Sequence, residues 1–163
     1  MAIEDEMKEK VGRAIGRIPS GIFILTAEHE DHRSGMLASW VQQTAFEPPM
    51  VSVSIGKGRP ILPLIAESHK FGLCQIGKQN KTLMKKFASG VDPSEDPFLG
   101  FNMLPHAETT VPVLADALAY LECEVACHVD AGADHDVFIG EVKAGDYFEG
   151  EPDVRLRENG FNY

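Results

Sequence analysis

The sequence predicts a mainly β protein of the α+β class, an antiparallel sheet closed as a barrel with peripheral helices. Strand-like stretches outnumber helical ones, they occur as adjacent hairpins, and no strand-helix-strand alternation is sustained. A length of 163 residues with 44% hydrophobic and 25% charged residues is typical of one soluble domain. We therefore expect a single domain over 1–163, with a helix at about 3–18, a barrel at about 20–148 and a tail at 149–163.

The first elements follow from periodicity. From Ile3 to Ile18 apolar residues recur at three- and four-residue steps, which predicts an amphipathic helix that ends at "PSG". The β-branched run 22–26 predicts a strand, and the polar turn "EHEDHRSG" leads to a second strand over 36–42, as in an antiparallel hairpin. After two prolines without amide donors, 50–55 alternates Val and Ile with Ser and predicts a third strand.

The second half continues this pattern. Pro60 before "ILPLIAES" predicts the first turn of a short helix, and 70–76 predicts another strand. A helix is expected over 79–88, where apolar side chains share one face, followed by an acidic loop over 89–97. The runs 118–129 and 137–144, separated by the turn "DAGADHD", predict a second hairpin.

Charge excludes some functions. The net charge of -10, from 15 basic against 25 acidic residues, repels phosphate backbones, so we expect no nucleic-acid partner. No apolar run approaches the ~20 residues that cross a bilayer, and the N-terminus is acidic and polar, which predicts a cytoplasmic protein without a membrane partner.

The cysteines and histidines predict neither a disulfide framework nor a metal site. Three cysteines without an export signal favour free thiols. Cys123 and Cys127 share one face of a predicted strand, about 13 Å apart, and we expect both to be small core residues. His29 and His32 lack a second matching pair, so no metal is expected.

Three segments are candidates for chemistry. In "GKGRP", Lys57 and Arg59 lie among glycines after a strand, which suits a phosphate site or, equally, a basic surface turn. "GMLASW" joins small residues to the only tryptophan, Trp40, and suits a flat ligand or an ordinary packed Trp. His135 lies between two aspartates before an apolar strand, where it suits a ligand contact or a solvated turn.

These segments together resemble one family. The stretch from "GIFILTAEHEDHRSGMLASWVQQ" through "HKFGLCQIG", "TLMKKFAS" and "PVLADALAYLECEV" to "DHDVFIGEV", roughly Ile18 to Gly145, resembles flavin reductase-like, FMN-binding split-barrel domains. "MLASWVQQ" and "LADALAYLECEV" resemble in particular the C-terminal flavin reductase module of flavodiiron (A-type) proteins of photosynthetic microbes, here standing alone. The resemblance implies a split β-barrel of the FMN-binding type.

The resemblance also implies roles for individual residues. The strand end and the residues after it would bind the isoalloxazine ring, largely through the backbone: Met36, Leu37, Ala38, Ser39, Trp40, Gln43 and Thr44. The phosphate would be bound by Lys57 and Arg59 with help from Lys81. The next strand, with Cys74 and Gln75, would approach the ribityl chain, and His135 would meet the nicotinamide. Many relatives have Thr-Ala-Ser-Ser at 37–40 and Asn at 74, so we expect weaker flavin binding here.

The function implied by this resemblance is an NAD(P)H:flavin oxidoreductase. Hydride would pass from NADH or NADPH to FMN, with FAD as the alternative flavin, and because the cofactors carry this chemistry no acid-base dyad is needed. A homodimer is implied as well. Two alternatives stay open: an electron-transfer flavoprotein that keeps FMN and serves a redox protein acceptor, and a non-catalytic flavin-binding module on the same barrel.

Overall fold

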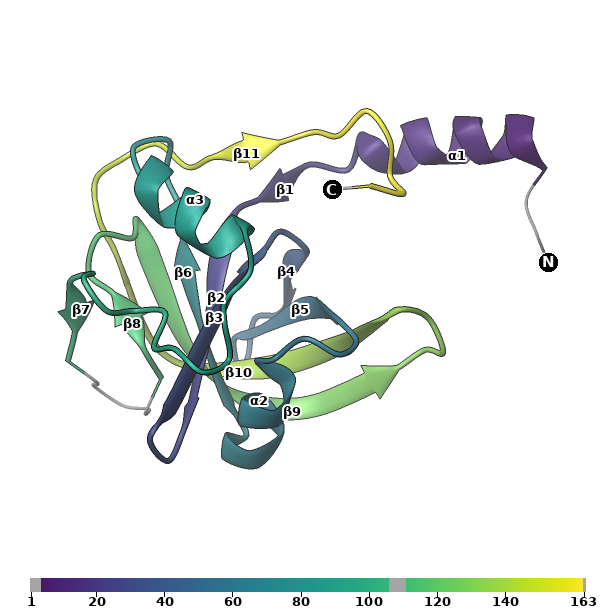
Figure 1. The fold of residues 1–163 in the computed structure, drawn as a ribbon. Coiled ribbons are helices and arrows are strands. Elements are labelled where there is room, and N and C mark those ends of the chain that lie inside the picture. Colours follow the sequence, from purple (N-terminus) through teal and green to yellow (C-terminus); the bar gives the residue numbers. More distant parts are fainter. Residues whose placement is uncertain (1–3, 106–110, 163) are drawn as a thin grey trace.

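A computed structural model of the chain describes residues 4–105 and 111–162 (Figure 1). Ile3 and Tyr163, which the sequence analysis assigned to the helix and the tail, lie outside these residues. The main sheet is antiparallel throughout, in the order β3(His32–Ala38), β2(Phe23–His29), β6(Lys70–Gln75), β9(Ala119–Asp130), β10(His135–Tyr147), β5(Met50–Gly56) and β4(Val41–Ala45). Two small sheets pair β1(Ser20–Gly21) with β11(Val154–Arg155) and β7(Met103–Leu104) with β8(Val113–Leu114). The helices are α1(Asp5–Gly16), α2(Leu62–Ser68) and α3(Lys81–Ala88).

The mainly β fold and both predicted hairpins are confirmed. The predicted strand over 36–42, however, is two strands. β3 pairs with β2 as far as Ala38. The next strand, β4, begins at Val41 and pairs with β5, at the opposite end of the strand order. The amide of Ser54 donates to the carbonyl of Trp40 at 3.1 Å across this crossing. The interruption therefore carries the chain from one edge of the sheet to the other, which closes the barrel.

Two apolar clusters hold the barrel together. The inner one fills the barrel and includes Phe71, Leu73 and Val53, and Ile61 and Ile65 join it from α2 and the turn before it. The outer cluster lies on the other face of β2 and β6, and includes the following residues: Ile24, Cys74, Leu83, Phe87 and Phe98. Leu83 and Phe87 are the buried positions of α3, so the helix predicted from its periodicity covers this outer face.

The prediction that both Cys123 and Cys127 lie in the core is wrong for Cys127, which is exposed. Between Val125 and Cys127 the register with β10 shifts by one residue, a β-bulge. An extra residue reverses which side chains face inward beyond it, so Cys127 lies on the opposite face from Cys123. Residues 126–130 of β9 are exposed on both faces. Cys123, which comes before the bulge, stays fully buried.

The end of the predicted tail packs against α1. The amide of Arg157 donates to the carbonyl of Gly16 at 2.9 Å, and that of Gly160 to Gly12 at 2.6 Å, so the tail runs antiparallel to the helix (Figure 1). Phe161 lies against Gly12. The buried positions of α1 are these two glycines, whereas Met7, on the expected apolar face, is 52% exposed.

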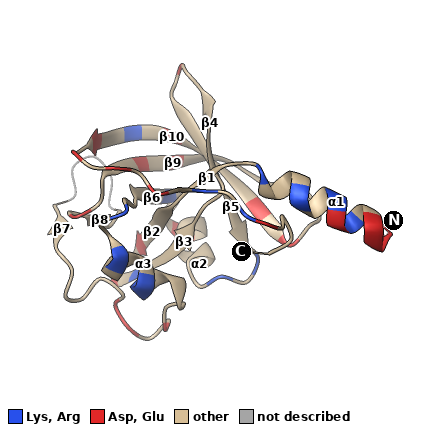
Figure 2. Cartoon of the chain, turned by 90° about the horizontal axis from the view of Figure 1, so that it is seen from above, with Lys and Arg blue, Asp and Glu red and all other residues tan. Residues whose placement is uncertain are grey.

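None of the described helices combines the length and apolar composition needed to span a membrane. Figure 2 shows acidic and basic residues alternating along α1, with acids in its first turn and Arg13 in its last. This order complements the helix dipole.

Candidate functional site

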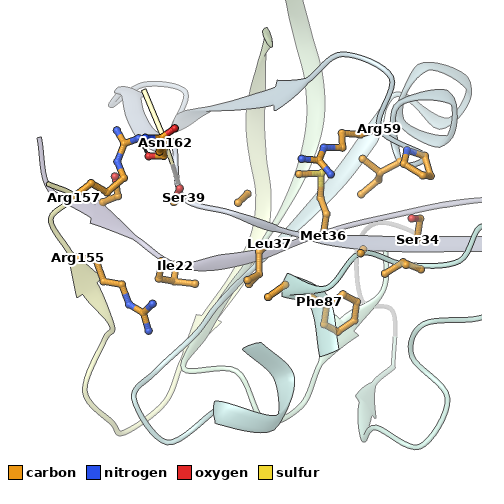
Figure 3. Close-up of a pocket in the computed structure, with 18 of the residues that line it drawn as sticks. Ile22, Ser34, Met36, Leu37, Ser39, Arg59, Phe87, Arg155, Arg157 and Asn162 are labelled. Carbon is orange, nitrogen blue, oxygen red and sulfur yellow. Dashed lines mark hydrogen bonds between the residues drawn. The ribbon is translucent and has the colours of Figure 1, made fainter. Parts of the chain in front are cut away.

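A cavity of about 890 Å³ runs along β3, between α3, the turn at 56–60 and the C-terminal tail (Figure 3). This volume lies in the range of roughly 300 to 1,000 Å³ that is common for small-molecule sites. The floor is the second half of β3 and the residue after it, namely Gly35, Met36, Leu37, Ala38 and Ser39.

The floor suits a flat ligand for two reasons. Among the described strands none pairs with the outer edge of β3, so backbone amides and carbonyls along that edge can serve a ligand. The floor side chains are small or apolar, and at Gly35 a Cβ would come within 2.8 Å of the Phe87 ring. Ile22 and Phe87 add apolar walls. A planar apolar group with polar edges fits these surroundings.

The turn at 56–60 separates the two cations that the sequence analysis treated together. Arg59 lies on the cavity wall, but Lys57 does not. The ammonium of Lys57 lies 2.8 Å from Asp130 and 3.8 Å from Asp136, and its amide donates to the Asp134 carbonyl at 2.9 Å. The hydrogen bond to Asp130 raises the pKa of Lys57 and lowers that of Asp130. Lys57 thus ties the turn to the β9–β10 hairpin.

His135 lies beside this turn, at the start of β10, and its register partner is Gly56. Nδ1 lies 2.9 Å from the Asp134 carboxylate, and this hydrogen bond lowers the pKa of Asp134. A Cβ on Gly56 would lie 3.7 Å from Nε2 of His135 and 3.5 Å from Nε of Arg59, so both side chains border one glycine. The imidazole also meets the Trp40 ring, at 4.7 Å between centroids and a tilt of 46°.

The opposite end of the cavity is built by the tail, which the sequence analysis did not assign to the site. Arg157 lies over the Trp40 ring at 5.4 Å and donates to the carbonyls of Gly160 (3.4 Å) and Asn162 (2.9 Å). Arg155 donates to both carboxylate oxygens of Asp153, at 3.0 and 2.7 Å. The available signal was the pair of arginines in "RLR" within the tail of an acidic chain.

The predicted site residues divide into three groups. Those on the cavity wall are Met36, Leu37, Ala38, Ser39 and Arg59. Trp40 and His135 adjoin the wall through Arg157 and Arg59. The remaining predicted residues lie off the wall: Gln43, Thr44, Lys57, Cys74, Gln75 and Lys81.

Residues of the third group are either exposed or buried away from the cavity. Gln43 and Thr44 are exposed on β4, and Lys81 is exposed at the start of α3. The Cys74 thiol is fully buried in the outer cluster, and this burial raises its pKa to about 12. Such a thiol is protonated at neutral pH and shielded from a ligand. Among residues 4–105 and 111–162 no group of three His, Cys, Asp or Glu side chains is arranged to hold a metal ion.

The comparisons with known proteins agree on one family. The family described as "Flavin reductase like domain" matches residues 15–157. The chain is 40% identical over 134 residues to diflavin flavoprotein A 1 of Synechocystis sp., a match that covers 82% of this chain and 23% of that protein. The chain therefore spans about a quarter of the length of the curated relatives that it matches.

Solved structures share the fold. The NADH:FAD oxidoreductase SgcE6 of Streptomyces globisporus superposes with a TM-score of 0.83 at 22% identity, over 98% of this chain and 94% of that one. The flavin reductase PheA2 gives 0.77 at 28% identity, over 94% of each chain. The styrene monooxygenase flavin reductase of Pseudomonas putida S12 gives 0.75 at 28% identity, over 88% and 90%. By sequence match and by its split-barrel fold, the chain belongs to the flavin reductase-like domain family.

Proposed function

We propose that the chain binds FMN in the cavity along β3 and reduces it with a hydride from NADH or NADPH. The observation that carries this proposal is the combination of an unpaired strand edge, small floor residues and Arg59 at one end of a single cavity. The names of similar proteins support reduction of a flavin, because they include an NADH:FAD oxidoreductase and two flavin reductases.

The floor and walls would hold the flavin ring. The edge of β3 from Met36 to Ser39 offers backbone donors and acceptors to the polar rim of the ring, while Ile22 and Phe87 contact its apolar part. Arg59 would bind the phosphate, because a guanidinium pairs with two phosphate oxygens at once. Lys57, already bound to Asp130, would hold the turn in place instead of contacting the ligand.

His135 and Trp40 would orient the nicotinamide. Bound flavin supplies the hydride acceptor, so the protein needs to position the two rings and to keep water from between them. His135 is held by Asp134 on one side and meets Trp40 on the other, which restricts its ring before any ligand arrives. A restricted imidazole can donate a hydrogen bond to a ligand amide without a large ordering cost.

We also propose that the chain acts as a homodimer in the cytoplasm. Support for an interface comes from Phe46, which is 89% exposed at the end of β4, and from Val129 in the β9–β10 hairpin, which is 43% exposed. The three cysteines are all free, which suits a reducing compartment. Sedimentation velocity at micromolar concentration tests the dimer, and a monomer would contradict it.

The main test is spectroscopic. Purified protein is titrated with FMN while flavin fluorescence and melting temperature are followed, and the FMN-loaded protein is then mixed anaerobically with NADH or NADPH. We expect quenching, thermal stabilisation and rapid bleaching of the flavin band. Bleaching only by a reduced protein partner would favour the electron-transfer alternative. Bound flavin that is reduced neither by a nicotinamide donor nor by a protein partner would favour the non-catalytic module. No change in fluorescence or melting temperature with saturating FMN would overturn flavin binding itself.

A pair of substitutions tests separately whether Arg59 and Lys57 bind the FMN phosphate. Arg59→Ala should weaken FMN binding by about 10-fold, the loss expected for one charge-assisted contact, whereas Lys57→Ala should change it by less than about 2-fold. Arg13→Ala removes the same charge from the exposed face of α1 and serves as the control. Equal weakening by Arg59→Ala and Lys57→Ala would show that both cations bind the phosphate.

A further inference from the structure

We propose that Arg155 and Arg157 of the C-terminal tail form a second anion subsite, which takes the phosphates of a dinucleotide. This inference rests on the proposed function, because it concerns the same cavity, and it names the class of substrate that the far end of the cavity accepts.

The distribution of charge is the first argument. The chain has a net charge of -10 and only 15 basic residues. Three arginines nevertheless line this one cavity, with Glu158 as the single acid among the described lining residues. In a chain with a net negative charge, such a local excess of guanidinium groups favours a negatively charged ligand.

The positions of the arginines are the second argument. Figure 3 shows Arg59 beside Met36, and Arg155 and Arg157 at the other end of the view, beyond Leu37. FMN has one phosphate, and a phosphate bound at Arg59 leaves the other end of the cavity without an anion. A ligand that uses both ends brings further phosphates, either those of a nicotinamide dinucleotide beside FMN or the second phosphate of FAD.

Arg155 is fixed in place but keeps unused donors. Asp153, whose side chain is 11% exposed, accepts from Nε and one terminal nitrogen of Arg155, and that same terminal nitrogen lies 3.3 Å from the Met84 sulfur. The other terminal nitrogen has no hydrogen-bond partner among the described residues. A guanidinium has five N–H donors in a rigid plane, so a carboxylate on one edge leaves another edge for a phosphate.

Arg157 likewise keeps hydrogen-bond donors for a ligand. One terminal nitrogen donates to the carbonyls of Gly160 and Asn162, and the guanidinium lies over the Trp40 ring. Its other terminal nitrogen makes no hydrogen bond in the described part of the chain, and Arg157 lines the cavity. This nitrogen is therefore the one that can donate to a phosphate oxygen at this end of the cavity.

The test compares ligands that differ in their phosphates. ADP-ribose carries the pyrophosphate of a nicotinamide dinucleotide without the reactive ring, so its binding is independent of turnover. We would measure by calorimetry the affinity of ADP-ribose for FMN-loaded and FMN-free protein, and the affinities of FMN and FAD for the FMN-free protein. The variants are Arg155→Ala, Arg157→Ala, Arg157→Lys and the double alanine change, with Arg13→Ala on α1 as the matched control.

The double alanine variant should bind ADP-ribose at least about 10-fold more weakly, with FMN affinity changed by less than about 2-fold. Arg157→Lys should keep part of the affinity, because it keeps the charge but not the planar donor set. A selective loss of FAD affinity would instead assign the subsite to the second phosphate of FAD.

Two further outcomes would overturn the inference, and a third would separate it from the proposed function. Unchanged ADP-ribose and FAD affinities in the double variant would overturn it, and so would an equal fall in FMN and ADP-ribose affinity, because the arginines would then serve a single shared phosphate. Wild-type protein that binds ADP-ribose in an arginine-dependent way but never binds FMN would support the subsite while overturning the proposed function.

Discussion

Gly16→Ala should loosen the C-terminal tail from α1 and open the end of the cavity that the tail builds. A Cβ at this position would lie 2.2 Å from the carbonyl oxygen of Arg157, where ordinary contact begins at 3.4 Å. The tail and the helix must therefore separate by roughly 1 Å at this point, which a close-packed interface does not absorb without strain. The hydrogen bond from the Arg157 amide to the Gly16 carbonyl lies at this contact.

The expected size of this effect follows from the hydrogen bonds that Gly16→Ala would weaken. The two backbone hydrogen bonds that join the tail to Gly16 and Gly12 contribute about 1 kcal/mol each. A loss of 1 to 2 kcal/mol raises the population of the detached tail by roughly 5- to 30-fold. Helix propensity acts in the opposite direction, because alanine favours a helix over glycine by about 1 kcal/mol. A looser tail could therefore not be attributed to a weaker α1.

Limited trypsinolysis measures the population of the detached tail, because we expect cleavage after Arg155 and Arg157 only when the tail opens. When opening is fast relative to cleavage, the rate follows the open population, so we expect cleavage to accelerate by about 5- to 30-fold. The emission of Trp40, the only tryptophan, should shift as Arg157 leaves its ring. Ala14→Ser, on the exposed side of the same helix, is the control. Wild-type rates of cleavage in Gly16→Ala would refute the reasoning.

Three further predictions concern single side chains. His135→Ala should raise KM for the nicotinamide donor by about 10-fold and leave FMN affinity within about 2-fold, and unchanged steady-state turnover would show that His135 has no such role. The hydrogen bonds from Arg155 lower the pKa of Asp153 below the unfolded value of about 3.9, so the charged pair stabilises the fold above that pH and is lost as the pH falls through the folded pKa. Wild type should therefore have a higher melting temperature than Asp153→Asn at pH 7, and the two melting temperatures should converge as the pH falls through the lowered pKa of Asp153. A constant difference at all pH values would contradict this assignment. Both carboxylate oxygens of Glu122 are buried without a hydrogen-bond partner among the described residues, so Glu122→Met should raise stability by about 1 kcal/mol, or roughly 3 °C, in a thermal melt. A lower melting temperature would show that the carboxyl is used.

Local patterns in the sequence were enough to predict most of the strands and helices. The alternation over 50–55 and the two hairpins appear where expected, and Gly35 to Ser39 of "GMLASW" form the floor of the cavity. Periodicity works for these elements because each presents one face to an apolar cluster. It did not predict the break after Ala38, because nothing local marks the place where the chain crosses between sheet edges.

Composition and short motifs by themselves determined the fold class and the family to which the chain is similar. The tertiary structure alone decided which of two neighbouring cations faces the cavity, since Asp130 lies 73 residues beyond Lys57 and reaches it only through the β9–β10 hairpin. It likewise placed Cys127 on the opposite face from Cys123, through a bulge, and brought the tail to Trp40. The physical reason is the same each time: a charge, a register or a wall of a cavity depends on partners distant in the chain, which local periodicity does not encode.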